Sequence, residues 1–72
     1  MNKENLERYK DRIVTIGVPH FEYPNKLFFH TGLLLSLESD TITIKKESEE
    51  LLFLYTDIKF LKALGSSEPH NE

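Results

Sequence analysis

The chain has 72 residues, no cysteine and a formal net charge of −3. So short a chain buries only one small core, and without cysteine it has no disulfide or thiolate zinc site, so its stability must come from close packing or self-association. Its longest apolar runs, at 33–35 and 51–55, are far below the roughly 18 residues that cross a bilayer. The charged start does not resemble a secretory signal, so we expect a soluble, cytoplasmic protein.

The N-terminal segment 2–11 predicts a short amphipathic helix. Leu6, Tyr9 and Ile13 are spaced by three and four residues among charged side chains, which places them on one helix face. A helix this short is unstable alone in water. We therefore expect it to dock on the body of the protein or on a neighbouring subunit.

The next two segments predict a strand and a rigid connection. Residues 12–18 are rich in β-branched side chains and are followed by proline, a pattern typical of a first strand. The segment 19–26 then encloses Phe21 and Tyr23 between two prolines. Because proline lacks a backbone donor, we expect a rigid loop or a distorted sheet edge there.

Residues 27–38 predict one long, curved strand. Apolar side chains alternate along it, and the odd-numbered set is the more apolar, so we expect that set to face the core. Gly32 lies near the middle, where a strongly curved strand bends or bulges. Curvature of this kind lets a small sheet close on itself. The odd-numbered set is Leu27, Phe29, Thr31, Leu33, Leu35 and Leu37.

Two further strands follow, and the second predicts a partner surface. After a turn at Ser39-Asp40, the alternation of Ile42 and Ile44 with polar residues predicts a half-exposed strand. After the acidic turn 47–50, the segment 51–56 is apolar at both parities, and a sheet this small covers only one of its faces. We therefore predict an interface between copies of the chain. The predicted oligomer interface comprises Leu52, Phe53, Leu54 and Tyr55.

The last apolar segment, 58–64, fits both a strand and a helix, and we favour the strand. Residues 65–72 lack apolar anchors and predict a disordered C-terminal tail. Together the elements predict a single, mainly β domain over residues 1–64. Its expected architecture is a small, five-stranded, strongly bent antiparallel barrel with an N-terminal helix.

In this order the segments resemble the Sm-like small β-barrel family, over roughly residues 6–64. The stretch HTGLLLSLESDTITI is similar to the first Sm signature, and only apolar positions represent the second. An SH3-like barrel of another family has the same pattern. The resemblance implies a small barrel, formation of oligomers such as rings, and association with RNA. The matching positions are Gly32, Leu34, Leu37 and Glu38 in the first signature and Ile58, Phe60 and Leu61 in the second.

The residues with which RNA-binding Sm-like proteins read uridine-rich RNA are replaced in this chain. Where those proteins carry an asparagine after the acidic residue, this chain has Thr41-Ile42. Where they carry an Arg-Gly or Lys-Gly pair before the last strand, it has Tyr55-Thr56-Asp57. Neither of the two elements with which the family reads RNA is therefore present in this sequence.

Two functions remain open, and neither is enzymatic. No catalytic motif is readable, and His20, Glu22 and His30 lack a spacing specific for metal, so we expect no cofactor and no metal. The first function is an Sm-like oligomer that binds RNA by base stacking and lysine–phosphate contacts, although the acidic balance does not favour it. The second is an oligomeric protein-interaction module of SH3-like type that binds no nucleic acid and pairs through sheet edges with itself or another protein. The predicted RNA contacts are Lys45, Lys46, Lys59, Lys62, Phe21 and Tyr23.

Overall fold

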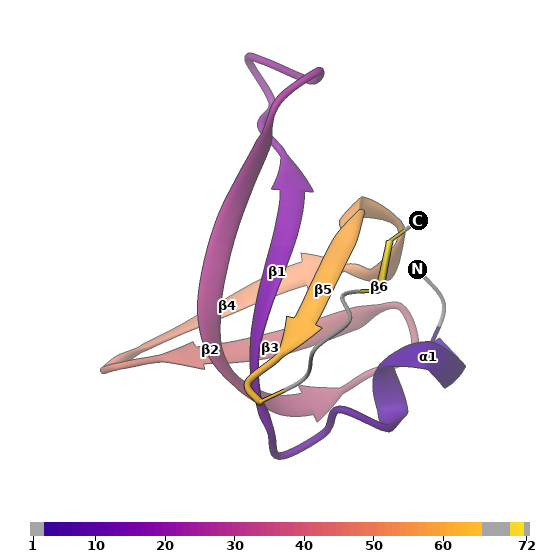
Figure 1. The fold of residues 1–72 in the computed structure, drawn as a ribbon, viewed down its shortest axis with the longest axis vertical. Helices are drawn as coiled ribbons and strands as arrows, with labels where there is room; N and C mark the ends of the chain where they lie inside the picture. The colour runs from indigo at the N-terminus through magenta and orange to yellow at the C-terminus, as the bar shows by residue number, and fades with distance from the viewer. Residues whose placement is uncertain (1–2, 66–69, 72) are drawn as a thin grey trace.

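A computed structural model of the protein describes residues 3–65 and 70–71 and has mainly β structure. The six strands of the described residues belong to one antiparallel sheet, in the order β4-β3-β2-β1-β5-β6, and a short helix precedes it (Figure 1). This confirms the predicted five antiparallel strands and N-terminal helix, and adds a short sixth strand. The elements are α1 (Lys3–Glu7), β1 (Ile13–Pro19), β2 (Leu27–Leu37), β3 (Thr41–Lys46), β4 (Glu49–Leu54), the 3-10 helix η1 (Tyr55–Asp57), β5 (Phe60–Ala63) and β6 (His70–Asn71).

The sheet is bent, and β2 is the strand that carries it through the bend. Its first part pairs with β1 and its second part with β3, so β1 and β3 lie on different sides of the bend (Figure 1). Within the described residues, the outer strands β4 and β6 each pair on one side only. The hydrogen-bonded sheet is therefore open, whereas the sequence predicted a closed barrel.

Helix α1 ends at Glu7 and is therefore shorter than the predicted helix 2–11. Past the helix, Asp11 has a positive φ of 66°, and its backbone N–H donates to the Leu34 carbonyl oxygen at 2.9 Å. This bond ties the chain to β2, and the left-handed backbone at Asp11 is incompatible with continuing the helix. Leu6 is fully buried, so the helix docks on the body through its apolar face.

The core lies on the concave side of the bent sheet. It draws alternate residues from β1, β2, β3 and β5, since successive strand side chains point to opposite faces. Helix α1 and the segment around η1 complete it. The buried core residues are Leu6, Val14, Ile16, Val18, Leu34, Ile42, Ile44, Tyr55, Ile58, Leu61 and Ala63.

The prediction that the odd-numbered residues of β2 face the core is wrong for most of the strand. Leu34 is fully buried, whereas Phe29 is 56% exposed. The pairing shifts between Leu34 and Ser36, which makes Leu35 an extra residue in a β-bulge. The bulge reverses the parity, so that Leu37, an odd-numbered residue, also packs against the core.

Gly32 lies where β2 passes close to β3. A β-carbon at this position would clash with the Lys45 carbonyl oxygen and lie 2.8 Å from the Ile44 Cγ2 atom. Only a residue without a side chain allows this approach of two backbones. The glycine is therefore needed at the bend, as the sequence predicted, for a steric reason.

The C-terminal segment forms strand β5, which confirms the strand favoured for 58–64. Ile58 is fully buried just before this strand. Most of the predicted tail 65–72 lies outside the described residues. Within it, residues 70–71 form β6, where Asn71 pairs with Phe60 of β5.

Candidate binding surfaces

Strand β4 is an outer strand with apolar side chains on both of its faces. Its register with β3 sets Leu52 opposite Thr43 and Leu54 opposite Thr41. Leu52 and Leu54 are 66% and 45% exposed, whereas Phe53 is half-buried and packs against the core. The structure therefore places Leu52 and Leu54, two of the four predicted interface residues, on the open surface.

Tyr55, the fourth predicted interface residue, belongs to the core instead. Its hydroxyl donates a hydrogen bond to the Glu38 carbonyl oxygen, and its backbone N–H donates to the Asp40 carbonyl oxygen at 3.1 Å. Burial, followed by the negative charges of Glu38, Asp40 and Glu7, raises the pKa of the Tyr55 phenol above its usual 10.0. These two hydrogen bonds link η1 to the β2–β3 turn, and Tyr55 is only 7% exposed.

The four lysines predicted to contact RNA fall into two separate groups. Lys45 and Lys46 lie near the tip of the β3–β4 hairpin, where the register sets Glu50 and Glu49 opposite them. Lys59 directly precedes β5, and Lys62 lies within it. Strand β5 lies away from the tip of the β3–β4 hairpin (Figure 1). The structure therefore does not gather the four into one basic patch. The first pair faces carboxylates across the hairpin.

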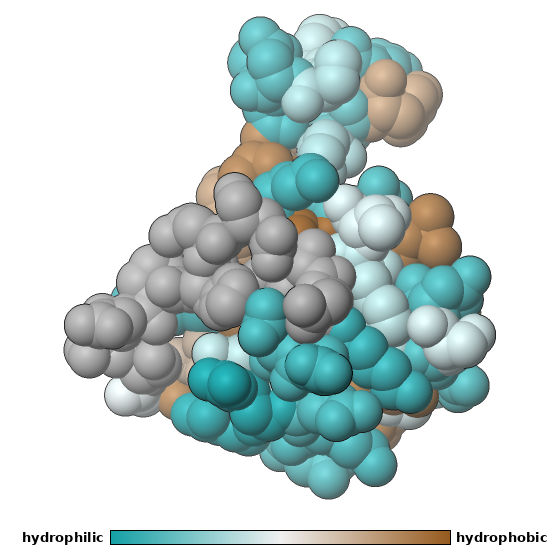
Figure 2. Space-filling model, turned by 90° about the vertical axis from the view of Figure 1, so that its right-hand side faces the viewer, coloured by the Kyte–Doolittle hydropathy of each residue, from teal (hydrophilic) through white to brown (hydrophobic). Residues whose placement is uncertain are grey.

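The hairpin of β1 and β2 ends in an aromatic cluster built around His20. Its ring lies 4.6 Å from Phe21, 5.6 Å from Tyr23 and 4.4 Å from Phe28, measured between ring centroids. The Lys26 ammonium nitrogen lies 5.6 Å from the centroid of the Tyr23 ring. Figure 2 shows this tip as a knob that stands clear of the body. Phe21 is 86% exposed, so one face of the stack is open to solvent.

The loop at this tip is held by its own backbone hydrogen bonds. The Tyr23 N–H donates to the His20 carbonyl oxygen at 3.2 Å, and the Lys26 N–H donates to the Tyr23 carbonyl oxygen at 2.9 Å. The Glu22 N–H also donates to the His20 Nδ1 atom at 3.1 Å. These bonds fold the loop back on itself between β1 and β2.

The convex face of β1, β2 and β5 carries a second aromatic group, which the sequence reading did not identify as a surface. Gly17 of β1 pairs with Phe29 of β2 on one side and with Phe60 of β5 on the other. The two rings meet edge-to-face above the glycine, with centroids 5.6 Å apart. The signal was present in the sequence, because a glycine within a β-branched strand leaves room for neighbouring side chains.

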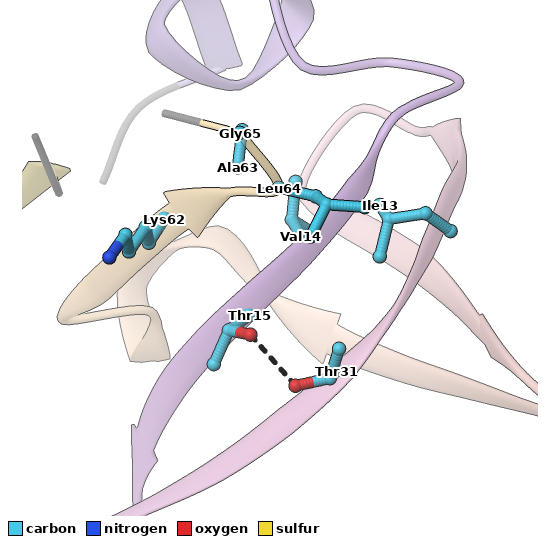
Figure 3. Close-up of a pocket in the computed structure, with 8 residues that line it drawn as sticks. All are labelled: Ile13, Val14, Thr15, Thr31, Lys62, Ala63, Leu64 and Gly65. Carbon is cyan, nitrogen blue, oxygen red and sulfur yellow. Dashed lines mark hydrogen bonds between the residues drawn. The ribbon is translucent and has the colours of Figure 1, made fainter. Parts of the chain in front are cut away.

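An open hollow lies on the same face, nearer the start of β1 than the Phe29–Phe60 pair, where β1 and β5 run side by side (Figure 3). Its volume is about 230 Å³. The Thr15 and Thr31 hydroxyls hydrogen-bond to each other at 2.7 Å within it. Its lining consists of Ile13, Val14, Thr15, Thr31, Lys62, Ala63, Leu64 and Gly65.

No protein-family model matches the chain, and searches of the curated proteins and of the solved structures return no significant match. Among the residues that the structure describes, no group of three or more His, Cys, Asp or Glu side chains is placed to hold a metal ion. No helix within the described part of the chain is long and apolar enough to cross a membrane.

His30 is a residue of β2, and its ring contacts a ring of β4. Its ring centroid is 5.1 Å from that of Phe53. Partial burial and, to a lesser degree, the positive charge of Lys46 lower the pKa of His30 below its usual 6.5. An aromatic contact and a lowered pKa favour the neutral imidazole, which suits a packing role.

Proposed function

We propose that this protein is a non-catalytic assembly module of Sm-like type, whose copies associate through the outer strand β4. The observation that carries the proposal is the combination in β4 of a backbone edge that pairs with no other strand of the described residues and two exposed leucines, Leu52 and Leu54. An exposed apolar edge strand is a template for pairing with another chain.

The order of the elements supports the Sm-like part of the proposal. A short helix leads into β1, a long bulged β2 crosses the bend, and η1 separates β4 from β5. The resemblance in sequence implies the same series of segments. We propose that the bent sheet acts as a small barrel whose two outer edges are completed by neighbouring subunits.

The composition of β4 supports its use as an interface. Monomeric proteins usually protect an edge strand with lysine, proline or a bulge. Strand β4 has the sequence EELLFL, and its pairing with β3 is regular along its whole length. Its only charges, Glu49 and Glu50, lie at its start, which leaves the apolar end of the edge unprotected.

A second copy of the chain is the partner that best fits this edge. A chain of 72 residues without cysteine gains stability by burying apolar surface between subunits. An edge-to-edge contact between identical chains satisfies backbone donors and acceptors on both partners at once. Leu52 and Leu54 then lie beside side chains of the neighbouring subunit's strand, which cover part of their exposed surface.

Light scattering on a sizing column tests this proposal. We expect a native mass that is a multiple of 8.4 kDa, and a fall to 8.4 kDa in the Leu52→Lys variant. Since Leu52 is exposed, the substitution leaves the core intact, and circular dichroism checks this. Phe21→Lys is the matched control, because it places the same charge at a more exposed apolar position and should keep the wild-type mass. A wild-type mass of 8.4 kDa at all protein concentrations would rule out the proposal.

A further inference from the structure

We infer that the convex side of β1, β2 and β5 binds an extended segment of another protein in which a carboxylate side chain lies between two apolar ones. The segment runs along the strands, with apolar side chains at its positions i and i+4 and the carboxylate at i+2. The inference goes beyond assembly through β4, because it uses a face of the sheet and not its edge.

The three strands have apolar side chains on both of their faces. On the concave side these side chains form the core. On the convex side Ile13 and Phe29 are 40% and 56% exposed, and Leu64, which lines the hollow with Ile13, is 75% exposed (Figure 3). Exposed apolar surface of this kind marks a contact site, because covering it removes it from water.

The register of the three strands arranges the convex side chains in three rows. Successive rows are two residues apart along a strand, which is about 6.6 Å. The outer two rows are apolar. The middle row is polar and contains Lys62, the only charged side chain of the three strands. The rows consist of Phe29, Gly17 and Phe60; of Thr31, Thr15 and Lys62; and of Ile13 and Leu64.

An extended segment matches the spacing of these rows. Its residues i, i+2 and i+4 point to the same side and are also about 6.6 Å apart. A segment that follows β1 therefore meets an apolar row, the polar row and the second apolar row in turn. The hollow has a volume of about 230 Å³. Sites for whole small molecules usually start at roughly 300 Å³, so this one suits a side chain of a longer partner.

The middle row has donors for a carboxylate. The Thr15 and Thr31 hydroxyls hydrogen-bond to each other at 2.7 Å, which uses one of their two hydrogens and leaves the other to donate. Lys62 lines the same hollow and supplies the positive charge. A carboxylate at the middle row thus accepts from a hydroxyl and from an ammonium group, and charge-assisted hydrogen bonds of this type are the stronger ones.

The charges favour another protein over a second copy of the chain as the occupant. All acidic residues between positions 3 and 65 lie outside β1, β2 and β5. If two copies packed through this side, Lys62 of each would be enclosed against a surface whose strands contain no carboxylate. Burial of an unpaired ammonium group is costly. A segment that brings its own carboxylate pairs with Lys62 and covers the apolar rows at the same time.

NMR titration of the isotope-labelled full chain with a short peptide tests the inference. The probe is acetyl-Leu-Ser-Glu-Ser-Phe-amide, which has the expected pattern and no terminal charges. We expect the backbone amide signals of β1, β2 and β5 to shift and those of β4 to stay in place. Phe29→Ala should bind the probe about tenfold more weakly, because it removes an aromatic anchor of one apolar row.

The middle row is tested by moving and by reversing charges. The peptide acetyl-Leu-Glu-Ser-Ser-Phe-amide has the same composition but turns its carboxylate to the opposite side, so it should bind about fivefold more weakly than the probe. Lys62→Gln should weaken binding of the probe by a similar factor. Lys62→Glu should prefer a peptide with lysine in place of the glutamate. Lys46→Gln is the matched control, since it removes a lysine of the β3–β4 hairpin and should bind like the wild type.

Three results of the titration would overturn the inference. They are absence of binding at millimolar peptide, equal binding of the two glutamate peptides, and equal binding by Phe29→Ala and the wild type. A native mass that falls in Phe29→Ala would also overturn it, because the convex side then joins copies of the chain. Phe29 and Lys62 are both exposed, so their substitution leaves the core intact, and circular dichroism checks this.

The same experiments separate this inference from the proposed function. Leu52→Lys tests assembly and leaves the convex side unchanged, so it should retain the wild-type affinity for the probe. If the native mass is that of one chain but Phe29→Ala still weakens binding, assembly through β4 is wrong and the inference stands. If assembly depends on Leu52 and the probe does not bind, the inference is wrong and assembly through β4 stands.

Discussion

The ring of Phe29 lies directly over Gly17, with its Cε1 atom 3.0 Å from the point where a β-carbon on the glycine would be. Phe60 closes the other side, because its own Cβ atom is 3.1 Å from the same point. A glycine in the middle of a central strand thus seats a pair of aromatic rings on the convex face of the sheet. Stability measurements test this arrangement directly.

The Gly17→Ala substitution is expected to destabilise the protein by about 1 kcal/mol, because the added methyl group must displace the Phe29 ring. Urea denaturation measures the change. The control is the same substitution in a Phe29→Ala background, where the part of the cost caused by the Phe29 ring should vanish and only the contact with the Phe60 Cβ atom remains. An equal cost in both backgrounds would show that the ring does not rest on the glycine.

Gly32→Ala is expected to cost more, about 3 kcal/mol, because the new methyl group meets the Lys45 backbone and cannot be relieved by rotating a side chain. Gly65→Ala is the comparison, since no atom lies within 4 Å of its β-carbon position and only its positive φ of 84° opposes the change. Thermal unfolding of both variants should rank Gly32→Ala well below Gly65→Ala. The opposite ranking would contradict the close approach of β2 and β3.

Tyr55→Phe is expected to lower the free energy of unfolding by about 1 kcal/mol, the usual value of one hydrogen bond, because the Glu38 carbonyl oxygen loses its donor. Tyr23→Phe removes a hydroxyl from an exposed ring and should leave stability unchanged. Neither change should alter the native mass, since Tyr55 lies in the core of one chain. If Tyr55→Phe dissociates the assembly but keeps wild-type stability, Tyr55 belongs to the subunit interface and not to the core.

His30 makes stability depend on pH in a defined direction. Because its pKa in the folded protein is lowered below 6.5, the unfolded chain binds more protons just below that pH. The stability that neutral His30 contributes is therefore complete above 6.5 and decreases as the pH falls through the interval between the two pKa values. Urea midpoints measured on both sides of this interval should differ less in His30→Gln than in the wild type.

A second variant separates the two causes of the lowered pKa. Lys46→Gln removes the positive charge but leaves the partial burial, which is the larger cause. It should therefore reduce the pH dependence only in part. An unchanged pH dependence in His30→Gln would assign the effect to other groups.

Features that depend on local sequence were predictable. The β-branched residues of β1, the glycine at position 32 and the apolar segment of β4 each indicated an element that the structure contains. The apolar residues at both parities of β4 predicted an interface of Leu52, Phe53, Leu54 and Tyr55, and of these the structure exposes Leu52 and Leu54. These predictions succeeded because alternation and backbone sterics act over a few neighbouring residues.

Features that depend on distant pairing were not predictable. The odd-numbered residues of β2 looked like the core set, yet the bulge at Leu35 changes which side of the strand is buried. Tyr55 looked like an interface residue, yet the Glu38 carbonyl oxygen across the turn holds it inside. In each case the deciding partner is on another strand or turn, so no local pattern contains it.

The amino-acid sequence by itself therefore determined a short, cysteine-free, mainly β chain with a helix at its start, a glycine at its bend and an aromatic loop between two prolines. Only the tertiary structure decided which face of β2 is buried, that Phe29 and Phe60 meet over Gly17, and that Lys59 and Lys62 lie apart from Lys45 and Lys46. The physical reason is that strand propensity and turn chemistry are local, whereas a surface is made by register between strands. A shift of one residue in that register moves every side chain of a strand to the opposite face.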